Sequence, residues 1–94
     1  MVYFVANIKI EDDFEYNKYL DKVDEIFSKF NGKYLVVEDN PKLMEGNRKY
    51  NRVVIIQFEN EDDFNKWYFS NEYQNILIHR LKGAECSSIL VNGK

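Results

Sequence analysis

Residues 2–14 read VYFVANIKIEDDF, and residues 53–64 read VVIIQFENEDDF. Each stretch is an apolar run that leads into the same four residues, Glu-Asp-Asp-Phe, and an aromatic-rich amphipathic segment follows each one. When the second stretch is laid on the first, Val5 aligns with Ile55, and the polar residue Asn7 aligns with Gln57. Because a strand followed by a helix occurs twice, the chain is predicted to form a split β-α-β unit with internal pseudo-symmetry.

The first copy of the repeat leads into a helix that is predicted to begin at Asp12 or Asp13. Asp12 and Glu15 have the spacing of a capping box, in which side chains satisfy free N–H groups of the first turn. Apolar residues then recur every three or four positions, as one face of a helix requires; they are Tyr16, Leu20, Val23, Phe27 and Phe30. Asn31-Gly32 is predicted to end the helix, since both residue types tolerate a left-handed helix cap.

The rest of the chain supplies the remaining elements of a β-α-β-β-α-β order. Further strands are predicted over residues 34–38, 53–58 and 86–91, with a polar loop over 41–51. A short helix is predicted over 61–69, and Ser70-Asn71 separates it from further helical turns that end at Gly83. The fold class is therefore α+β and ferredoxin-like, with a four-stranded antiparallel sheet in the order 4-1-3-2 and both main helices on one face. Residues 1–94 are expected to form a single domain.

Charge and composition exclude several classes of protein. The net charge of −3 gives no basic field for a nucleic acid, and no stretch approaches the ~18 apolar residues of a membrane span. The first residues lack the basic region and cleavage site of a signal peptide, so none is expected. Cys86 is the only cysteine, which excludes an internal disulfide and makes the cytoplasm the expected location. No P-loop or glycine-rich dinucleotide turn occurs, and no cofactor is expected.

The two central strands are apolar on both faces, whereas an antiparallel sheet with one wet face normally alternates apolar and polar residues. One face would carry Phe4, Ala6, Ile8, Val54, Ile56 and Phe58. The other would carry Tyr3, Val5, Val53 and Ile55. Because the helices can cover only one face, the second would remain as a large exposed apolar patch. The sequence therefore predicts a homodimer in which two sheets stack through their open faces.

The chain as a whole resembles the DUF1330 family. The resemblance rests on Val5-Ala6-Asn7-Ile8, Gly32-Lys33-Tyr34-Leu35-Val36, Glu45-Gly46 and the run from Arg52 to Phe58, and above all on Trp67-Tyr68, Ser70, Glu72-Tyr73-Gln74 and Arg80. It implies a dimeric α/β barrel, a superfamily that includes cofactor-free monooxygenases, muconolactone isomerase-like enzymes and chlorite dismutase-like haem enzymes. The family usually has a Gly-Gly pair where this chain has Asn31-Gly32, and the loop at residues 39–42 is more acidic here.

Three residues are candidates for catalysis. Arg52 and Arg80 correspond to arginines of the family pattern, and a planar guanidinium suits a carboxylate or an enolate. The alternative for both is an ion pair with one of the many acidic residues. His79 is the only histidine and would titrate near neutral pH, but no orienting partner is visible in the sequence, so an exposed helical position is the alternative.

Six residues are candidates for binding a ligand. Asn7 and Gln57 lie at equivalent positions of the repeat, where they would either hydrogen-bond each other or the partner subunit, or line a polar pocket. The four aromatic candidates would form the walls and mouth of a pocket, although core packing accounts for them as well; they are Tyr16, Tyr19, Trp67 and Tyr73. The acidic residues 11–13 and 61–63 lie at helix starts, where capping explains them, and no metal site is predicted.

Two functions fit these residues. The chain is either a homodimeric protein or cofactor-free enzyme that binds a small carboxylate or an aromatic or lactone-like compound, or a non-catalytic dimeric domain. The two differ in what lies between sheet and helices. An enclosed cavity with convergent polar groups favours the first function, and filled space favours the second.

Overall fold

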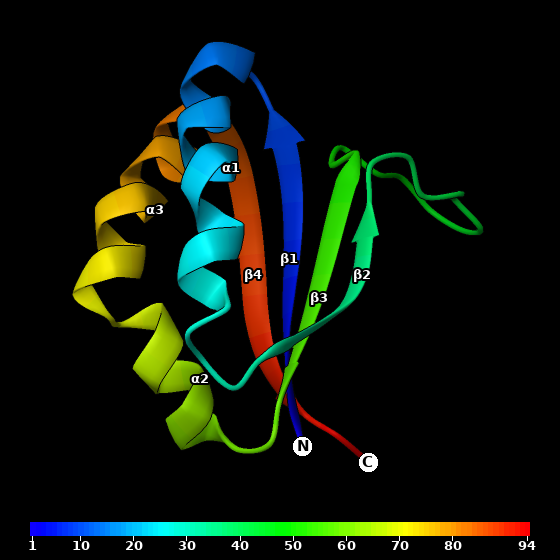
Figure 1. Cartoon of the computed structure of the whole chain (residues 1–94). Helices are drawn as coiled ribbons and strands as arrows, with labels where there is room; N and C mark the ends of the chain where they lie inside the picture. Colours follow the sequence, from blue (N-terminus) through cyan, green and yellow to red (C-terminus); the bar gives the residue numbers. More distant parts are fainter.

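The computed structural model describes residues 1–94 and contains one antiparallel sheet with a layer of helices on one face (Figure 1). The elements in chain order are β1 (Val2–Ile10), α1 (Asp13–Phe27), β2 (Lys33–Glu38), β3 (Arg52–Phe58), α2 (Glu61–Tyr68), α3 (Asn71–Gly83) and β4 (Ala84–Asn92). The strand order β2-β3-β1-β4 is the predicted order read from the other edge. The ferredoxin-like topology predicted from the repeat is therefore confirmed.

Each helix begins where a side chain accepts a hydrogen bond from the first turn. Asp12 Oδ1 accepts from the backbone N–H of Glu15 at 3.1 Å, as the capping spacing predicted. In the second copy of the repeat the cap is Asn60, so α2 begins earlier in the repeat than α1 does. Ser70 Oγ accepts from the N–H of Tyr73, which makes the predicted interruption the start of α3.

The end of α1 differs from the prediction. The helix ends at Phe27, and Ser28 caps it with a right-handed backbone, so Asn31-Gly32 forms no left-handed cap. Position 32 requires a glycine for a different reason, which is the close packing of two aromatic rings around it. A Cβ there would lie 2.5 Å from the Phe27 ring and 2.7 Å from the Phe58 ring, closer than packed atoms approach. This close packing fixes the path of the chain from α1 into β2.

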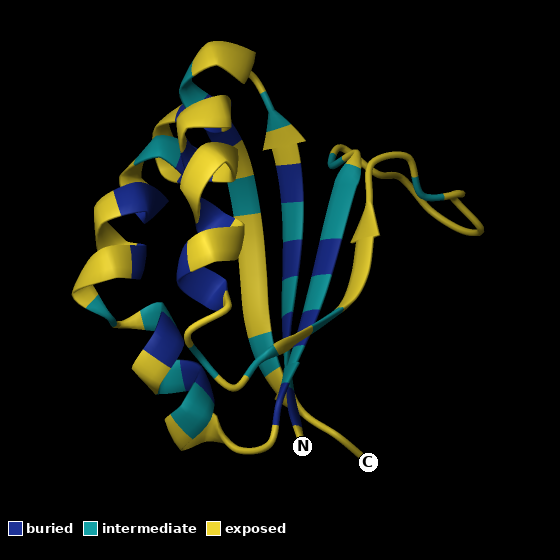
Figure 2. Ribbon diagram, in the orientation of Figure 1, coloured by how far each residue is buried: buried dark blue, intermediate teal, exposed yellow.

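The core lies between the helices and the inner face of the sheet. Along β1 and β3, buried and half-buried residues alternate (Figure 2), as expected for strands with one covered face. Trp67 is the centre of an aromatic cluster: its ring stacks on Phe58 at a centroid distance of 5.6 Å and meets Phe27 edge-on at 5.4 Å. The aromatic content of the sequence is thus explained in part by core packing.

The open face of the sheet is apolar, as predicted. Val5 is paired with Ile55 on one side and with Ile89 on the other, and Tyr3 is paired with Val91. Ile89 and Val91 are 56% and 39% exposed, and no helix covers this side of the sheet (Figure 1). No helix of the structure is long and apolar enough to cross a bilayer.

Candidate functional site

A cavity of about 330 Å³ lies between α1, α3 and the inner face of the sheet. Many of the side chains that line it are almost fully buried, among them Trp67 and Tyr73 at 0% exposure. Leu20 on α1 and Val37 on β2 also line it, and these are 37% and 52% exposed. The cavity therefore opens between α1 and β2 and extends inward to α3.

Arg80 lies at the deep end and is only 2% exposed. It lies on the α3 face that carries Tyr73 and Leu77, because residues at intervals of three and four share one side of a helix. Neither Nε nor Nη1 has a hydrogen-bond partner, and none of the ion pairs of the structure includes this side chain. The guanidinium lies 5.7 Å from the centre of the Tyr19 ring. The ion pair considered for Arg80 from the sequence is therefore absent.

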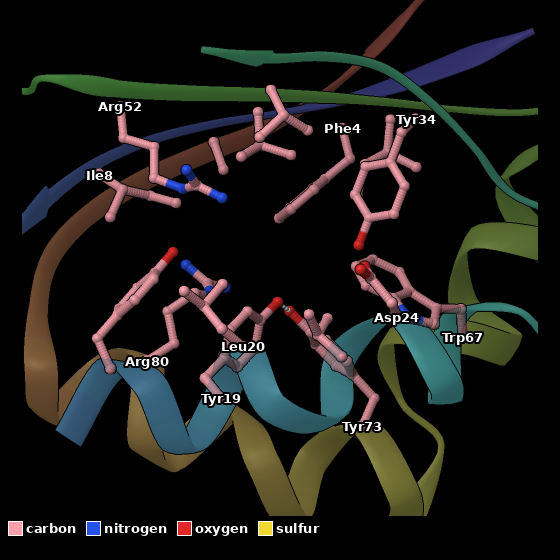
Figure 3. Close-up of a pocket in the computed structure, with 16 residues that line it drawn as sticks. Phe4, Ile8, Tyr19, Leu20, Asp24, Tyr34, Arg52, Trp67, Tyr73 and Arg80 are labelled. Atoms are coloured by element: carbon pink, nitrogen blue, oxygen red, sulfur yellow. Dashed lines mark hydrogen bonds between the residues drawn. The ribbon is translucent and has the colours of Figure 1, made fainter. Parts of the chain in front are cut away.

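A second guanidinium, that of Arg52 on β3, faces Arg80 across the same end of the cavity (Figure 3). Its Nη1 is paired with the carboxylate of Asp39, which is exposed, while its buried Nε has no partner. Two like charges in an apolar cavity repel each other strongly, since little solvent screens them. Their convergence creates a site for an anion, and planar guanidinium groups favour a carboxylate.

Three buried tyrosines complete the deep end. The hydroxyls of Tyr19 and Tyr73 hydrogen-bond each other at 2.7 Å. Burial raises the pKa of Tyr16, Tyr19 and Tyr73, and the nearby positive charge of Arg80 opposes the shift in each case. Burial disfavours the charge of Arg80 in turn, but the phenol oxygens of Tyr73 and Tyr19 outweigh burial and raise its pKa. At neutral pH these phenols are uncharged hydrogen-bonding groups beside a permanent cation.

The opposite end of the cavity carries Tyr34 and Asp24, whose hydroxyl and carboxylate face each other (Figure 3). Burial raises the pKa of Tyr34, and the negative charge of Asp24 adds to the shift. A β-bulge in β2 positions this wall. In a regular strand Tyr34 and Val37 would point to opposite faces, but the register shifts between Tyr34 and Val36, and both side chains line the cavity.

Tyr34 and Asp24 were not predicted from the sequence as site residues. For Asp24 a signal existed: it follows Leu20 by four residues and so lies on the apolar side of α1. For Tyr34 no such signal was available, because its strand carries apolar residues at almost every position and the bulge leaves no mark in the pattern.

His79, predicted as a catalytic candidate, does not reach the cavity. Its Nδ1 is hydrogen-bonded to the carboxylate of Glu15 on α1, an orienting partner that the sequence alone does not reveal. Neighbouring residues on a helix point about 100° apart, and Arg80 is the one that faces inward. The contact with His79 is the largest cause of a lowered pKa at Glu15.

Asn7 and Gln57 lie on the open face of the sheet, outside the cavity between sheet and helices. The suggestion that they bond each other is wrong: in the antiparallel register Asn7 is opposite Val53, and Gln57 is opposite Tyr3. Instead, Nη2 of Arg48 donates to Oδ1 of Asn7 at 3.1 Å. The other predicted binding residues line the cavity; they are Tyr16, Tyr19, Trp67 and Tyr73.

Solved structures with the same fold come from several bacteria. A protein of unknown function from Rhodopseudomonas palustris, RPA0582, superposes with a TM-score of 0.81 at 13% identity, over 99% of this chain and 82% of that one. SnoaB, a cofactor-independent oxygenase from Streptomyces nogalater, gives 0.66 at 15% identity, over 99% and 92%. A dimeric ferredoxin-like protein of unknown function from Thermobifida fusca gives 0.67 at 12% identity, over 98% and 90%. At these identities the likeness shows the fold alone.

No curated protein is significantly similar to this chain in sequence. A family model described as a domain of unknown function, DUF1330, matches residues 1–94. The match covers the full length of the sheet and helices and every residue that lines the cavity, and the chain therefore belongs to the DUF1330 family.

Proposed function

We propose that this protein binds a small organic acid in the cavity, with the acid group held by Arg80. The observation that carries the proposal is the buried guanidinium whose Nε and Nη1 have no partner. A buried N–H donor without a partner costs about 1–3 kcal/mol of folding free energy, and Arg80 has two such donors. A carboxylate that entered the cavity would supply the missing partner and accept two parallel hydrogen bonds from the guanidinium.

The walls of the cavity indicate the rest of the ligand. Of the residues that line it, only Arg52, Arg80 and Asp24 are charged, and aromatic and aliphatic side chains make up the remainder. The volume is near the lower end of the ~300–1,000 Å³ range of small-molecule pockets. Both features suit a compact acid with a flat apolar body. An open cavity with convergent polar groups also favours ligand binding over a purely structural domain.

The geometry supports binding more strongly than catalysis. A cofactor-free reaction on a bound acid would need a base beside the anion that the arginines stabilise. Asp24 is the one carboxylate that lines the cavity, and it lies at the end opposite Arg52 and Arg80 (Figure 3). His79 lies outside. Binding is therefore the primary proposal. Because neither Asp24 nor His79 lies beside the anion site, a reaction there would have to exchange protons with solvent or with the ligand itself.

The proposal is tested by calorimetric titration with matched acids and amides. Benzoate and cinnamate are expected to bind, whereas benzamide and cinnamamide, which have the same shape but no charge, are expected to bind at least about tenfold more weakly. Arg80→Met should weaken acid binding by roughly 10- to 100-fold. Arg48→Met is the control, because Arg48 is exposed and lies outside the cavity.

Two results would overturn the proposed function. Acids and amides of equal affinity would show that the cavity does not recognise charge. Unchanged acid binding by Arg80→Met would show that the anion is held elsewhere on the protein.

We also propose that two copies of the chain associate through the open face of the sheet. The half-buried residues Tyr3, Val5, Val53 and Ile55 form a continuous apolar surface with Ile89 and Val91. A patch of this kind is uncommon on a monomer, and stacking two sheets removes it from water. The Thermobifida fusca protein of the same fold is dimeric, which supports the association of two copies of this chain.

A further inference from the structure

We infer that the ligand is bipolar: a compact acid that carries a hydrogen-bond donor or an ammonium group at the end opposite its carboxylate. This inference rests on the proposed function and specifies the substrate class of the same cavity. Its basis is that the cavity has a positive end and a negative end, with an apolar section between them.

The positive end is formed by Arg80 and Arg52. Both guanidinium groups reach into the cavity, and each has a buried nitrogen without a partner. Because an arginine keeps its charge at any pH at which a protein is folded, this end attracts an anion under all such conditions.

The negative end is formed by Asp24 and Tyr34. The Asp24 carboxylate forms no ion pair, although Glu15 on the same helix is paired with Lys18 and with His79. Asp24 is exposed, so it needs no partner for stability, and its position at the mouth makes its carboxylate available as an acceptor. The Tyr34 hydroxyl beside it both donates and accepts.

The section between the two ends is apolar. Phe4, Ala6 and Ile56 from the sheet line it, together with Val23 from α1. Apolar surroundings screen charges poorly. A ligand whose charged groups face like charges at the ends of the cavity is therefore disfavoured. A ligand with a carboxylate at each end would place one of them against the Asp24 carboxylate. An acid with an alkyl group at its far end would make no polar contact with Asp24. A zwitterion or a hydroxy acid matches both ends.

The test uses three benzoates that differ only in the para substituent: aminomethyl, hydroxymethyl and ethyl. The three groups are nearly equal in size, so differences in affinity report the polar contact at the mouth. For the wild-type protein, the aminomethyl and hydroxymethyl compounds are expected to bind roughly tenfold more tightly than the ethyl compound. Asp24→Ala should remove this preference, so that the three compounds bind with similar affinity.

Asp21→Ala is the matched control, because Asp21 is an exposed acid on the same helix that does not line the cavity. Its ranking of the three compounds should equal that of the wild-type protein. If all three compounds bind equally and Arg80→Met weakens all of them, the proposed function stands and the bipolar ligand is wrong. If none of the three binds, both are wrong. A preference that persists in Asp24→Ala also contradicts the inference.

Discussion

Arg80 is the residue on which the account of this site depends. Buried cations in proteins are normally paired, and this one is surrounded by phenol rings and has two nitrogens without a partner. Such a residue lowers the stability of the ligand-free protein, and residues of this kind are retained where function requires them. Arg52 differs, because its charge is partly satisfied by Asp39 at the surface. The two arginines therefore have unequal roles, with Arg80 the principal contact for an anion.

Replacement of Arg80 by methionine is expected to stabilise the ligand-free protein. Methionine is flexible enough to fill the space, and removal of two buried N–H donors without partners should raise the free energy of unfolding by about 1–3 kcal/mol. Urea denaturation monitored by circular dichroism measures the change, and Lys42→Met, which removes an exposed lysine without an ion pair, should stay within about 0.5 kcal/mol of wild type. A less stable Arg80→Met protein would mean that the contacts of the guanidinium with the phenols outweigh the cost of its two unpaired donors.

The helices α1 and α3 act as a pair that forms one wall of the cavity. On the inside, the Tyr19 and Tyr73 hydroxyls join them; on the outside, Glu15 contacts His79. The pair packs closely at one end, because Gly83 lies against the backbone of Tyr16, where a Cβ would be 2.8 Å from the nitrogen. Contacts on both sides of the helix pair hold α1 and α3 together and so position Arg80 beside Tyr19.

The contact between Glu15 and His79 predicts a dependence of stability on pH. The pKa of Glu15 is lowered in the folded protein, chiefly by its hydrogen bond with His79. A carboxyl group with a lowered folded pKa stabilises the fold above its ordinary value near 4.5, and this contribution is lost as the pH falls through the folded value. Wild type should therefore be more stable than Glu15→Gln at about pH 6, and the difference should shrink as the pH falls below about 4.5.

Thermal unfolding of both proteins across this pH range measures the effect. Asp21→Asn serves as the control, since Asp21 has no ion pair and its substitution should change stability little across the range. A difference between wild type and Glu15→Gln that does not change with pH would contradict the assigned contact.

At the scale of the whole molecule, the inner and outer faces of the sheet have different roles. The inner face forms the core and the floor of the cavity, and the outer face is apolar without a cover in the single chain (Figure 2). A second copy on the outer face would leave the cavity mouth accessible, because the mouth lies between α1 and β2 on the other side. Association and ligand entry therefore use different faces.

Replacement of Ile89 by lysine is expected to dissociate the proposed dimer. The charge would lie between the stacked sheets, where its desolvation is costly, while in the monomer it is tolerated on an edge strand. Sedimentation velocity at micromolar concentration should show a dimer for wild type and a monomer for Ile89→Lys. Ile78→Lys, which changes a similarly exposed isoleucine on α3, should remain dimeric. A monomeric wild-type protein would contradict the proposal.

The sequence predicts the fold more completely than the site. The repeat with Glu-Asp-Asp-Phe was sufficient for topology, strand order and the faces of β1 and β3, because these depend on periodicity. The partners of Asn7 and Gln57 depend on register, which the repeat does not determine. Arg80 points inward and His79 outward because of the way in which α3 is rotated about its own axis. The contribution of Tyr34 depends on a bulge that no periodic pattern reveals.

A crystal structure of the protein with bound cinnamate tests the central claim most directly. The account predicts that the ligand occupies the cavity between α1, α3 and the sheet, with a carboxylate oxygen about 2.7–3.2 Å from a nitrogen of Arg80. A carboxylate that points to the mouth beside Asp24, or a cavity without ligand at saturating cinnamate, would contradict it.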